Sequence, residues 1–337
     1  MHRLANKKRL LLVILFLLCI AGSTYLITRI QNNRNTINPA TSPSIANILK
    51  DNQTVPQIIL DTDFAGDVDD VGALAILQAY ADNGQVDILG VMISSGNHYA
   101  PRAVDAINTY YGRPDIPIGI TWSPSVSIQS RYTLDIALDF PNDIDVIPNA
   151  IDLYREILAS KPDKSVIIVS VGFLTNLQGL LSSKPDENST LNGIDLVSAK
   201  VAYLVTMGGY YPNSKDHPDK KEYNFALDPA ATNYVVTNWP TPIFFSGYEI
   251  GEDIITGTSL DETAPDNPVR VAYKLYTGGR GRSSWDLTAV HFAVGNNKNV
   301  WQLIGPGINQ TLPNGANYWK EIADGQHYYL RNVFSKS

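Results

Sequence analysis

Short runs of β-branched and aliphatic residues alternate along the chain with longer stretches whose apolar positions recur about every three or four residues. The short runs predict strands at residues 57–60, 86–95, 116–121, 165–171, 200–207 and 241–247. The longer stretches predict helices at residues 69–84, 101–112, 150–160, 174–182 and 228–238. Strands that alternate with helices indicate an α/β fold, with a mainly parallel central sheet and helices on both faces. After residue 300, short apolar stretches separated by turn residues predict an antiparallel addition.

The N-terminal residues have a different pattern. Basic residues at positions 3, 7, 8 and 9 precede an uncharged stretch from Leu10 to Thr28, which can cross a bilayer at about 1.5 Å per residue. We therefore predict a transmembrane anchor or signal peptide at 1–30, a polar linker at 31–55 and a single domain at 56–337. The basic flank predicts that the domain is extracytoplasmic, either anchored to the membrane or, if the segment is cleaved, secreted or periplasmic.

Composition and charge exclude some functional classes. The chain has 337 residues, of which 44% are hydrophobic and 18% are charged, as in globular proteins. Its net charge of -7 argues against a nucleic-acid partner, because surfaces that bind nucleic acid are normally basic. The only cysteine, Cys19, belongs to the N-terminal segment. The predicted domain therefore has no disulfide, no thiol nucleophile and no thiolate metal site.

The turn between the first predicted strand and the first predicted helix is crowded with five aspartates, Asp61, Asp63, Asp67, Asp69 and Asp70. A helix N-terminus stabilises an exposed carboxylate by only about 0.3–1 kcal/mol, which does not account for five of them. A divalent cation would remove the repulsion, and ligation by oxygen alone favours Ca²⁺ or Mg²⁺ over Zn²⁺. The alternative is a solvated acidic turn whose aspartates cap the helix, although the apolar runs on both sides weigh against it.

Five ordered motifs carry a family resemblance. The stretch "ILDTDFAGDVDDVGALAIL" resembles the N-terminal signature of the calcium-dependent inosine-uridine nucleoside hydrolase family, with a turn two residues longer than in the best-known members. Four later segments resemble further family motifs in the same order: "GVMISSGNHYAPRAVDAIN", "IIVSVGFLTNL", "VTMGGYYPNSKDHPDKKEYNFALDPAA" and "GRSSWDLTAVHFAV". The resemblance covers roughly residues 57 to 295 and implies the Rossmann-like fold of nucleoside hydrolases.

The resemblance also implies a set of metal ligands. By the match of motifs, Ca²⁺ would be held by Asp63, Asp70 and Asp286 together with the main-chain carbonyl of Val171. Asp69 matches a position that contacts the ribose rather than the metal. Two other aspartates have less defined roles. Asp67 lies in the longer part of the turn and is either a ligand or a support for one, and Asp61 is expected to support the ligands.

In this family the reaction is hydrolysis of the N-glycosidic bond between a ribose and a base. The resemblance implies that a calcium-bound water, deprotonated by Asp63, attacks the anomeric carbon, and that Asn97, Glu222 and Asn224 hold the ribose hydroxyls. From the residues alone, Asn97 also fits a turn position, and Glu222 and Asn224 fit a solvated loop. The expected partner is a small nucleoside or N-riboside, and the sequence leaves a homo-oligomer open.

One position departs from the family pattern. Several members place a histidine immediately before the last metal aspartate, where it protonates the leaving base, but this chain has Trp285 there. An indole does not donate a proton near neutral pH, but it can stack on a base, and core packing is an equal alternative. His98, beside Asn97, is a candidate site residue. His291 is expected to pack structurally and His217 to lie in a solvated loop. The leaving-group acid and the preferred base therefore stay unassigned.

Two classes of function fit these patterns. The first is an enzyme, a calcium-dependent N-ribohydrolase that releases ribose and free base. The second is a calcium-dependent ribose or nucleoside-binding module with weak or no hydrolase activity, which Trp285 favours. A haloacid-type phosphotransferase, suggested by the spacing of Asp61 and Asp63, is disfavoured because "SWD" stands where a helical lysine and an acidic pair would be needed.

Overall fold

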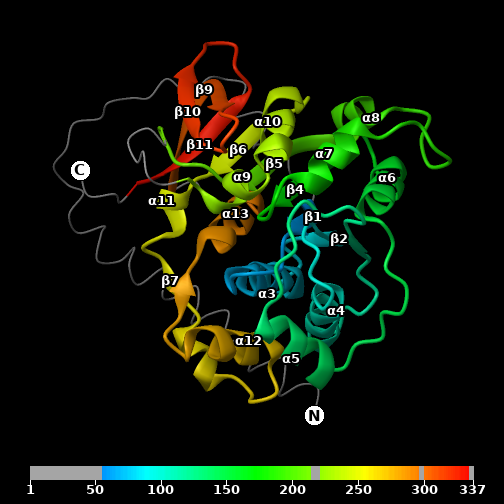
Figure 1. Cartoon of the computed structure of the whole chain (residues 1–337), viewed down its shortest axis with the longest axis vertical. Helices are drawn as coiled ribbons and strands as arrows, with labels where there is room; N and C mark the ends of the chain where they lie inside the picture. Colours follow the sequence, from blue (N-terminus) through cyan, green and yellow to red (C-terminus); the bar gives the residue numbers. More distant parts are fainter. Residues whose placement is uncertain (1–54, 214–220, 296–299, 334–337) are drawn as a thin grey trace. The chain divides into compact units, whose positions relative to one another are not determined.

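A mainly parallel sheet is the centre of the structure, a computed structural model that describes residues 55–213, 221–295 and 300–333. Within these residues, nine strands pair in the order β10-β9-β11-β6-β5-β4-β1-β2-β3 (Figure 1). Within this order, strands β1 to β6 lie next to one another, and each neighbouring pair among them is parallel. These six strands are β1 (Gln57–Thr62), β2 (Asp87–Ile93), β3 (Ile118–Ile120), β4 (Val166–Ser170), β5 (Val201–Met207) and β6 (Ile243–Ser246). The predicted α/β fold is therefore confirmed.

Helices cover both faces of this sheet, because its strands are apolar on both sides. Of two adjacent phenylalanines in β6, Phe244 packs on Phe292 and Phe245 on Phe225. One group of helices consists of α3 (Asp69–Asp82), α4 (Ala100–Tyr110), α5 (Arg131–Asp139), α12 (Pro268–Thr277) and α13 (Trp285–Ala293). The other consists of α6 (Ala150–Ser160), α7 (Thr175–Ser182), α8 (Gly193–Lys200) and α10 (Pro229–Asn238) (Figure 1).

The C-terminal strands extend the sheet beyond β6, and the predicted antiparallel addition is confirmed. The added strands are β9 (Trp301–Thr311), β10 (Asn317–Glu321) and β11 (His327–Asn332). β9 is antiparallel to both β10 and β11, whereas β11 runs parallel to β6. The last part of the described chain therefore supplies the second strand that pairs with β6, opposite β5.

Short elements connect the larger ones near the carboxyl ends of the parallel strands. They are α9 (Tyr223–Leu227), α11 (Tyr248–Gly251), β7 (Ile255–Thr256), the 3-10 helix η2 (Thr258–Glu262) and β8 (Arg282–Ser283). β7 and β8 form a separate two-stranded sheet, which brings residues 255–256 beside residues 282–283. Polar ligands bind outside the carboxyl ends of parallel strands, so these elements border the expected site.

The predicted anchor at 1–30, and the predicted linker apart from Val55, lie outside the described residues. Within the described part of the chain, no helix has the length and apolar character that crossing a membrane requires. All of the described residues belong to one compact unit.

Candidate active site

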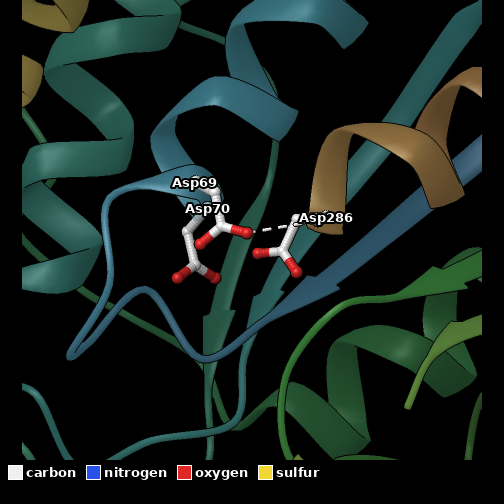
Figure 2. Close-up of side chains that lie close together, drawn as sticks. All are labelled: Asp69, Asp70 and Asp286. Carbon is white, nitrogen blue, oxygen red and sulfur yellow. Dashed lines mark hydrogen bonds between the residues drawn. The ribbon is translucent and has the colours of Figure 1, made fainter. Parts of the chain in front are cut away.

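Three carboxylates come together at the first turns of two helices. Asp69 and Asp70 begin α3, and Asp286 lies in the first turn of α13. One oxygen of each carboxyl group lies within 4.8 Å of the others, and all three residues are buried. Figure 2 shows the three side chains side by side, with a hydrogen bond from the main-chain amide of Asp286 to Oδ2 of Asp69 at 3.2 Å. Residues that are 217 positions apart therefore form one acidic cluster.

The electrostatics of this cluster fit a bound cation. Burial raises the pKa of Asp69 and of Asp286 well above the ordinary value of an aspartate. Repulsion from neighbouring carboxylates raises both pKa values further. A positive ion would reverse both effects, because it stabilises the ionised forms. The donor set consists of carboxylate oxygens, so it fits a hard divalent ion.

Asp63 lies beside Asp70 but outside the group of three. Burial, followed by the negative charge of Asp70, raises the pKa of Asp63 well above its usual range. Oδ1 of Asp63 accepts a hydrogen bond from the amide of Ala65 at 3.1 Å. Asp70 is held by its own partners, since its Oδ1 accepts hydrogen bonds from the Thr62 hydroxyl and from the Phe64 amide. The end of β1 and the turn after it thus fix both carboxylates, through the Thr62 hydroxyl and two main-chain amides.

Asp61 faces a different set of residues. Its Oδ2 accepts hydrogen bonds from the Tyr154 hydroxyl of α6 at 2.9 Å and from Nδ2 of Asn176 in α7 at 3.1 Å. The side chain is fully buried, and burial raises its pKa to about 7. Asp61 therefore attaches the end of β1 to the helices α6 and α7.

Val171 and Asn224 are in direct contact. Nδ2 of Asn224 donates hydrogen bonds to the main-chain carbonyl of Val171 at 3.0 Å and to that of Met207 at 3.2 Å. Asn224 therefore connects the carboxyl ends of β4 and β5. A carbonyl oxygen has two lone pairs, so that of Val171 can accept this bond and still be a metal ligand.

Glu222 caps α9 and is only 3% exposed. Its carboxylate accepts hydrogen bonds from the amides of Asn224 at 2.8 Å, Phe225 at 3.0 Å and Gly209 at 3.2 Å. Burial raises its pKa to about 7, although these bonds favour the ionised form. The alternative of a solvated loop for Glu222 and Asn224 is wrong, because both side chains are buried.

Asn97 holds the turn after β1, which carries the aspartates, through hydrogen bonds of its side chain. Its Nδ2 donates hydrogen bonds to the carbonyl of Phe64 at 3.2 Å and to Oγ1 of Thr133 at 3.1 Å. Its Oδ1 accepts a hydrogen bond from the amide of Tyr99 at 3.1 Å. Asn97 therefore holds the turn that follows β2, and its buried side chain joins this segment to residue 64.

Sequence reasoning missed the residue that pairs with Asp67. Arg282 donates from Nε to both carboxyl oxygens of Asp67 at 3.0 Å and from Nη2 to Oδ2 at 2.5 Å. These hydrogen bonds raise the pKa of Arg282 further above its already high value. The Tyr132 hydroxyl donates to the main-chain carbonyl of Asp67 at 2.5 Å. The available sequence signal was an arginine three residues before Trp285, in a segment already assigned to the site.

Arg282 and Trp285 belong to one row of stacked groups. The guanidinium carbon of Arg282 lies 4.8 Å from the centre of the Trp285 ring and 5.7 Å from that of Tyr276. The Tyr248 ring lies 5.2 Å from the Trp285 ring at an interplanar angle of 33°. Trp285 therefore packs between side chains of its own chain, at the border of the acidic cluster.

The histidines occupy different environments. His98 is exposed, directly after Asn97. His291 is buried, its Nδ1 lies 2.5 Å from the Tyr80 hydroxyl, and burial lowers its pKa to about 4. The expected structural packing of His291 is therefore correct. His217 lies outside the described residues.

A buried group of carboxylates at the carboxyl ends of the strands of an α/β sheet is where a metal-dependent hydrolase would hold its ion. The sequence matches the family described as inosine-uridine preferring nucleoside hydrolase over residues 58–300. The chain belongs to this family, and it is a hydrolase that acts on N-glycosyl compounds.

Several solved structures share the fold. An inosine-uridine preferring nucleoside hydrolase from Bacillus anthracis is 19% identical, with a TM-score of 0.59 over 82% of this chain and 94% of the other. A purine-preferring ribonucleoside hydrolase from Gardnerella vaginalis is 16% identical, with a TM-score of 0.61 over 82% of this chain and 94% of the other. The type III effector protein XopQ, complexed with adenosine diphosphate ribose, is 17% identical, with a TM-score of 0.57 over 86% and 94%. A comparison with curated proteins gave no significant match.

Proposed function

We propose that this chain hydrolyses the N-glycosidic bond of ribonucleosides or related N-ribosides, with Ca²⁺ as its metal. The observation that carries the proposal is the buried group of Asp69, Asp70 and Asp286, whose oxygens converge within 4.8 Å. These residues lie inside the region that matches the nucleoside hydrolase family. An oxygen-only donor set favours Ca²⁺ or Mg²⁺, and the family resemblance selects Ca²⁺.

Asp63, Asp70, Asp286 and the carbonyl of Val171 would hold the ion. Asp63 is placed in this set by the match of motifs, and its carboxylate lies next to that of Asp70. Asp69 is then the carboxylate that meets the ribose, as the match of motifs implies, and its Oδ2 accepts a hydrogen bond from the amide of Asp286. Arg282 occupies the carboxylate of Asp67, which supports a role for Asp67 outside the ligand set.

When bound, the ion would lower the pKa of the attacking water and orient ribose hydroxyls. Asp63 takes the proton from that water, and nearby carboxylates stabilise the positive charge that develops on the ribose. Nδ2 of Asn224 donates hydrogen bonds to two main-chain carbonyls, which leaves Oδ1 to accept a hydrogen bond from a ribose hydroxyl. The match of motifs also gives Glu222 and Asn97 ribose contacts, in addition to the main-chain hydrogen bonds that both side chains make.

A substrate panel tests this proposal. The full-length chain, with calcium and after chelation, would be incubated with inosine, adenosine, uridine, cytidine, nicotinamide riboside and adenosine diphosphate ribose. Calcium-dependent release of ribose or of a free base supports the proposal. Calcium-dependent binding without release would favour a binding module instead, and no binding or release would reject the function.

We also propose that the domain lies outside the cytoplasm, attached through residues 1–30. The support is the basic flank followed by a long uncharged stretch in the sequence. In intact cells, externally added protease should digest the domain if it faces the outside. In a bacterium with an outer membrane, that membrane would first be permeabilised. Full protection under these conditions, with a cytoplasmic marker also protected, would contradict this localisation.

A further inference from the structure

Arg282 stands out among the residues that border the acidic cluster, because it is a fixed cation whose donors are only partly used. Its hydrogen bonds to Asp67 run from Nε and Nη2. A guanidinium has five N–H donors, so those of Nη1 are left for another acceptor. The side chain is 35% exposed, which leaves room for a ligand to reach it.

The position of Arg282 ties it to the reaction site. It precedes Asp286 by four residues, and its partner Asp67 precedes Asp69 by two. The ion pair therefore joins the two segments that carry the acidic cluster. The charge of Arg282 also reaches the cluster directly, because it lowers the pKa of Asp69 against the larger opposing effects.

The orientation of the guanidinium is fixed on several sides. The two-pronged contact with Asp67 sets its plane, and the rings of Trp285 and Tyr276 lie at 4.8 Å and 5.7 Å. A donor that is held rigidly before the reaction stabilises developing charge at little cost of reorganisation. Asp67 thus fixes the orientation of the Arg282 guanidinium and also balances its charge.

Two phenols lie on this side of the cluster. Tyr276 lies against the guanidinium of Arg282, which also pairs with Asp67, and Tyr248 lies against the ring of Trp285. Burial raises the pKa of both phenols, so each holds its proton more tightly than a free tyrosine. A base that leaves here would depart with negative charge unless another group compensates for it.

We propose that Arg282 is a further catalytic residue, which donates a hydrogen bond from Nη1 to the departing base and stabilises its negative charge. This inference rests on the proposed N-riboside hydrolysis. The water oxygen forms a bond to C1′ while the C1′–N bond breaks, and its electron pair goes to the base. Asp63 receives the proton from the water and afterwards releases it to solvent, and the base anion takes a proton from solvent. The sum is one water consumed, with ribose and neutral base formed.

Two substrates with different leaving groups separate this role from a structural one. Hypoxanthine leaving from inosine needs help with its charge, whereas 4-nitrophenolate leaving from 4-nitrophenyl β-D-ribofuranoside needs little. The full-length chain with calcium would be compared as wild type, Arg282→Gln and Arg282→Lys. The control is Arg280→Gln, since Arg280 is exposed and donates from Nε to the carbonyl of Thr277.

We expect Arg282→Gln to lower kcat for inosine by about 100-fold, as the loss of one charge-stabilising donor does elsewhere. The loss on the nitrophenyl riboside should be at least tenfold smaller. Arg282→Lys should recover part of the inosine activity because it keeps the charge, and Arg280→Gln should match the wild type within about twofold.

Equal losses on both substrates in Arg282→Gln would overturn the catalytic role and leave Arg282 as a brace, while the proposed hydrolase function would stand. A thermal melt of each variant with calcium identifies losses that come from unfolding. If Arg282→Gln is unfolded, Arg282→Lys decides the question by the same ratio of substrates. A wild-type chain that hydrolyses neither substrate would reject this inference, and failure on the whole substrate panel would reject the proposed function as well.

Discussion

The main-chain amide of Asp286 donates a hydrogen bond to Oδ2 of Asp69 at 3.2 Å. This bond joins the first turns of α3 and α13, and both turns also carry a carboxylate of the acidic cluster. Helix N-termini favour negative charge, which offsets part of the repulsion among these aspartates. The remaining repulsion makes the cluster sensitive to a bound cation.

Removal of calcium should destabilise the chain. A ligand that binds only the native state adds stability by mass action, about 2.7 kcal/mol at a concentration one hundred times its Kd. We expect chelation to lower the melting temperature of the wild type in differential scanning calorimetry, and added calcium to restore it. In the variant Asp286→Asn, the same two conditions should differ much less. A wild-type melting temperature that chelation leaves unchanged would contradict the metal site.

Substitution of Asp63 and substitution of Asp69 should have different effects on turnover, KM and calcium affinity. Because Asp63 is the proposed base, Asp63→Asn should reduce ribose release by about 100-fold or more. As Asp63 is also a proposed ligand, isothermal titration should give weaker calcium binding for Asp63→Asn than for Asp69→Asn. Asp69→Asn should mainly raise KM. The reverse order of calcium affinities would assign the ligand role to Asp69, and wild-type turnover by Asp63→Asn would falsify the assigned base.

Arg155 should be a large contributor to stability far from the cluster. Its guanidinium is 2% exposed, pairs with Asp186 at 2.6 Å and also donates to the carbonyls of Ser189 and Leu191 at 3.0 Å. Arg155→Met leaves these acceptors without their buried donor, so we expect a loss of about 3 kcal/mol in the free energy of unfolding.

The matched control for Arg155 is Lys200→Gln. Lys200 forms an ion pair with Asp163, whose side chain is 74% exposed. An exposed pair contributes little, so urea denaturation should give a change within about 0.5 kcal/mol for this variant. Equal changes in the free energy of unfolding for the two substitutions would show that the buried network around Arg155 stabilises the fold no more than an exposed ion pair does.

His327 should make stability depend on pH. Burial lowers its pKa to about 4 in the folded chain, where its Nδ1 accepts a hydrogen bond from the amide of Asn309 at 2.9 Å. The unfolded chain has a histidine pKa near 6.5, so between about pH 6.5 and 4 the unfolded state binds more protons. Stability is therefore lost as the pH falls through this range, by at most about 1.4 kcal/mol per pH unit for one such group.

The variant His327→Gln keeps an acceptor for the Asn309 amide but does not titrate. Denaturant unfolding of the wild type and of this variant at pH 7, 6 and 5 measures the difference. We expect the wild type to lose more stability than His327→Gln as the pH falls. Parallel pH profiles would mean that His327 titrates equally in the folded and unfolded states.

Much of the fold follows from local patterns in the sequence. Six parallel strands and the five helices that alternate with them were predicted from apolar periodicity, since buried strands and covering helices must each present apolar residues to the sheet. The helices α5, α8 and α12 were not predicted. α12 had clear signals, because Asn267 caps it, Pro268 starts it and Gly278 ends it in a left-handed conformation.

The site was predictable only in part, because its contacts are distant in sequence. The five crowded aspartates indicated a cation site, but their order along the chain did not reveal that Asp69 approaches Asp286. The pairing of Asp67 with Arg282 spans 215 residues and was not found. The buried cap made by Glu222 was also missed, because three charged residues precede it in a stretch that looked like a polar loop.

The parallel pairing of β11 with β6 has a practical consequence for anyone who expresses this protein. The match to the family ends at residue 300, which invites cloning of a shorter gene that stops there. Such a truncation would remove β11 from its place beside β6, so that β6 would change from an interior strand to an exposed edge strand. An exposed edge strand pairs with strands of other molecules, so the shortened product should aggregate, whereas a product that keeps β9, β10 and β11 should not.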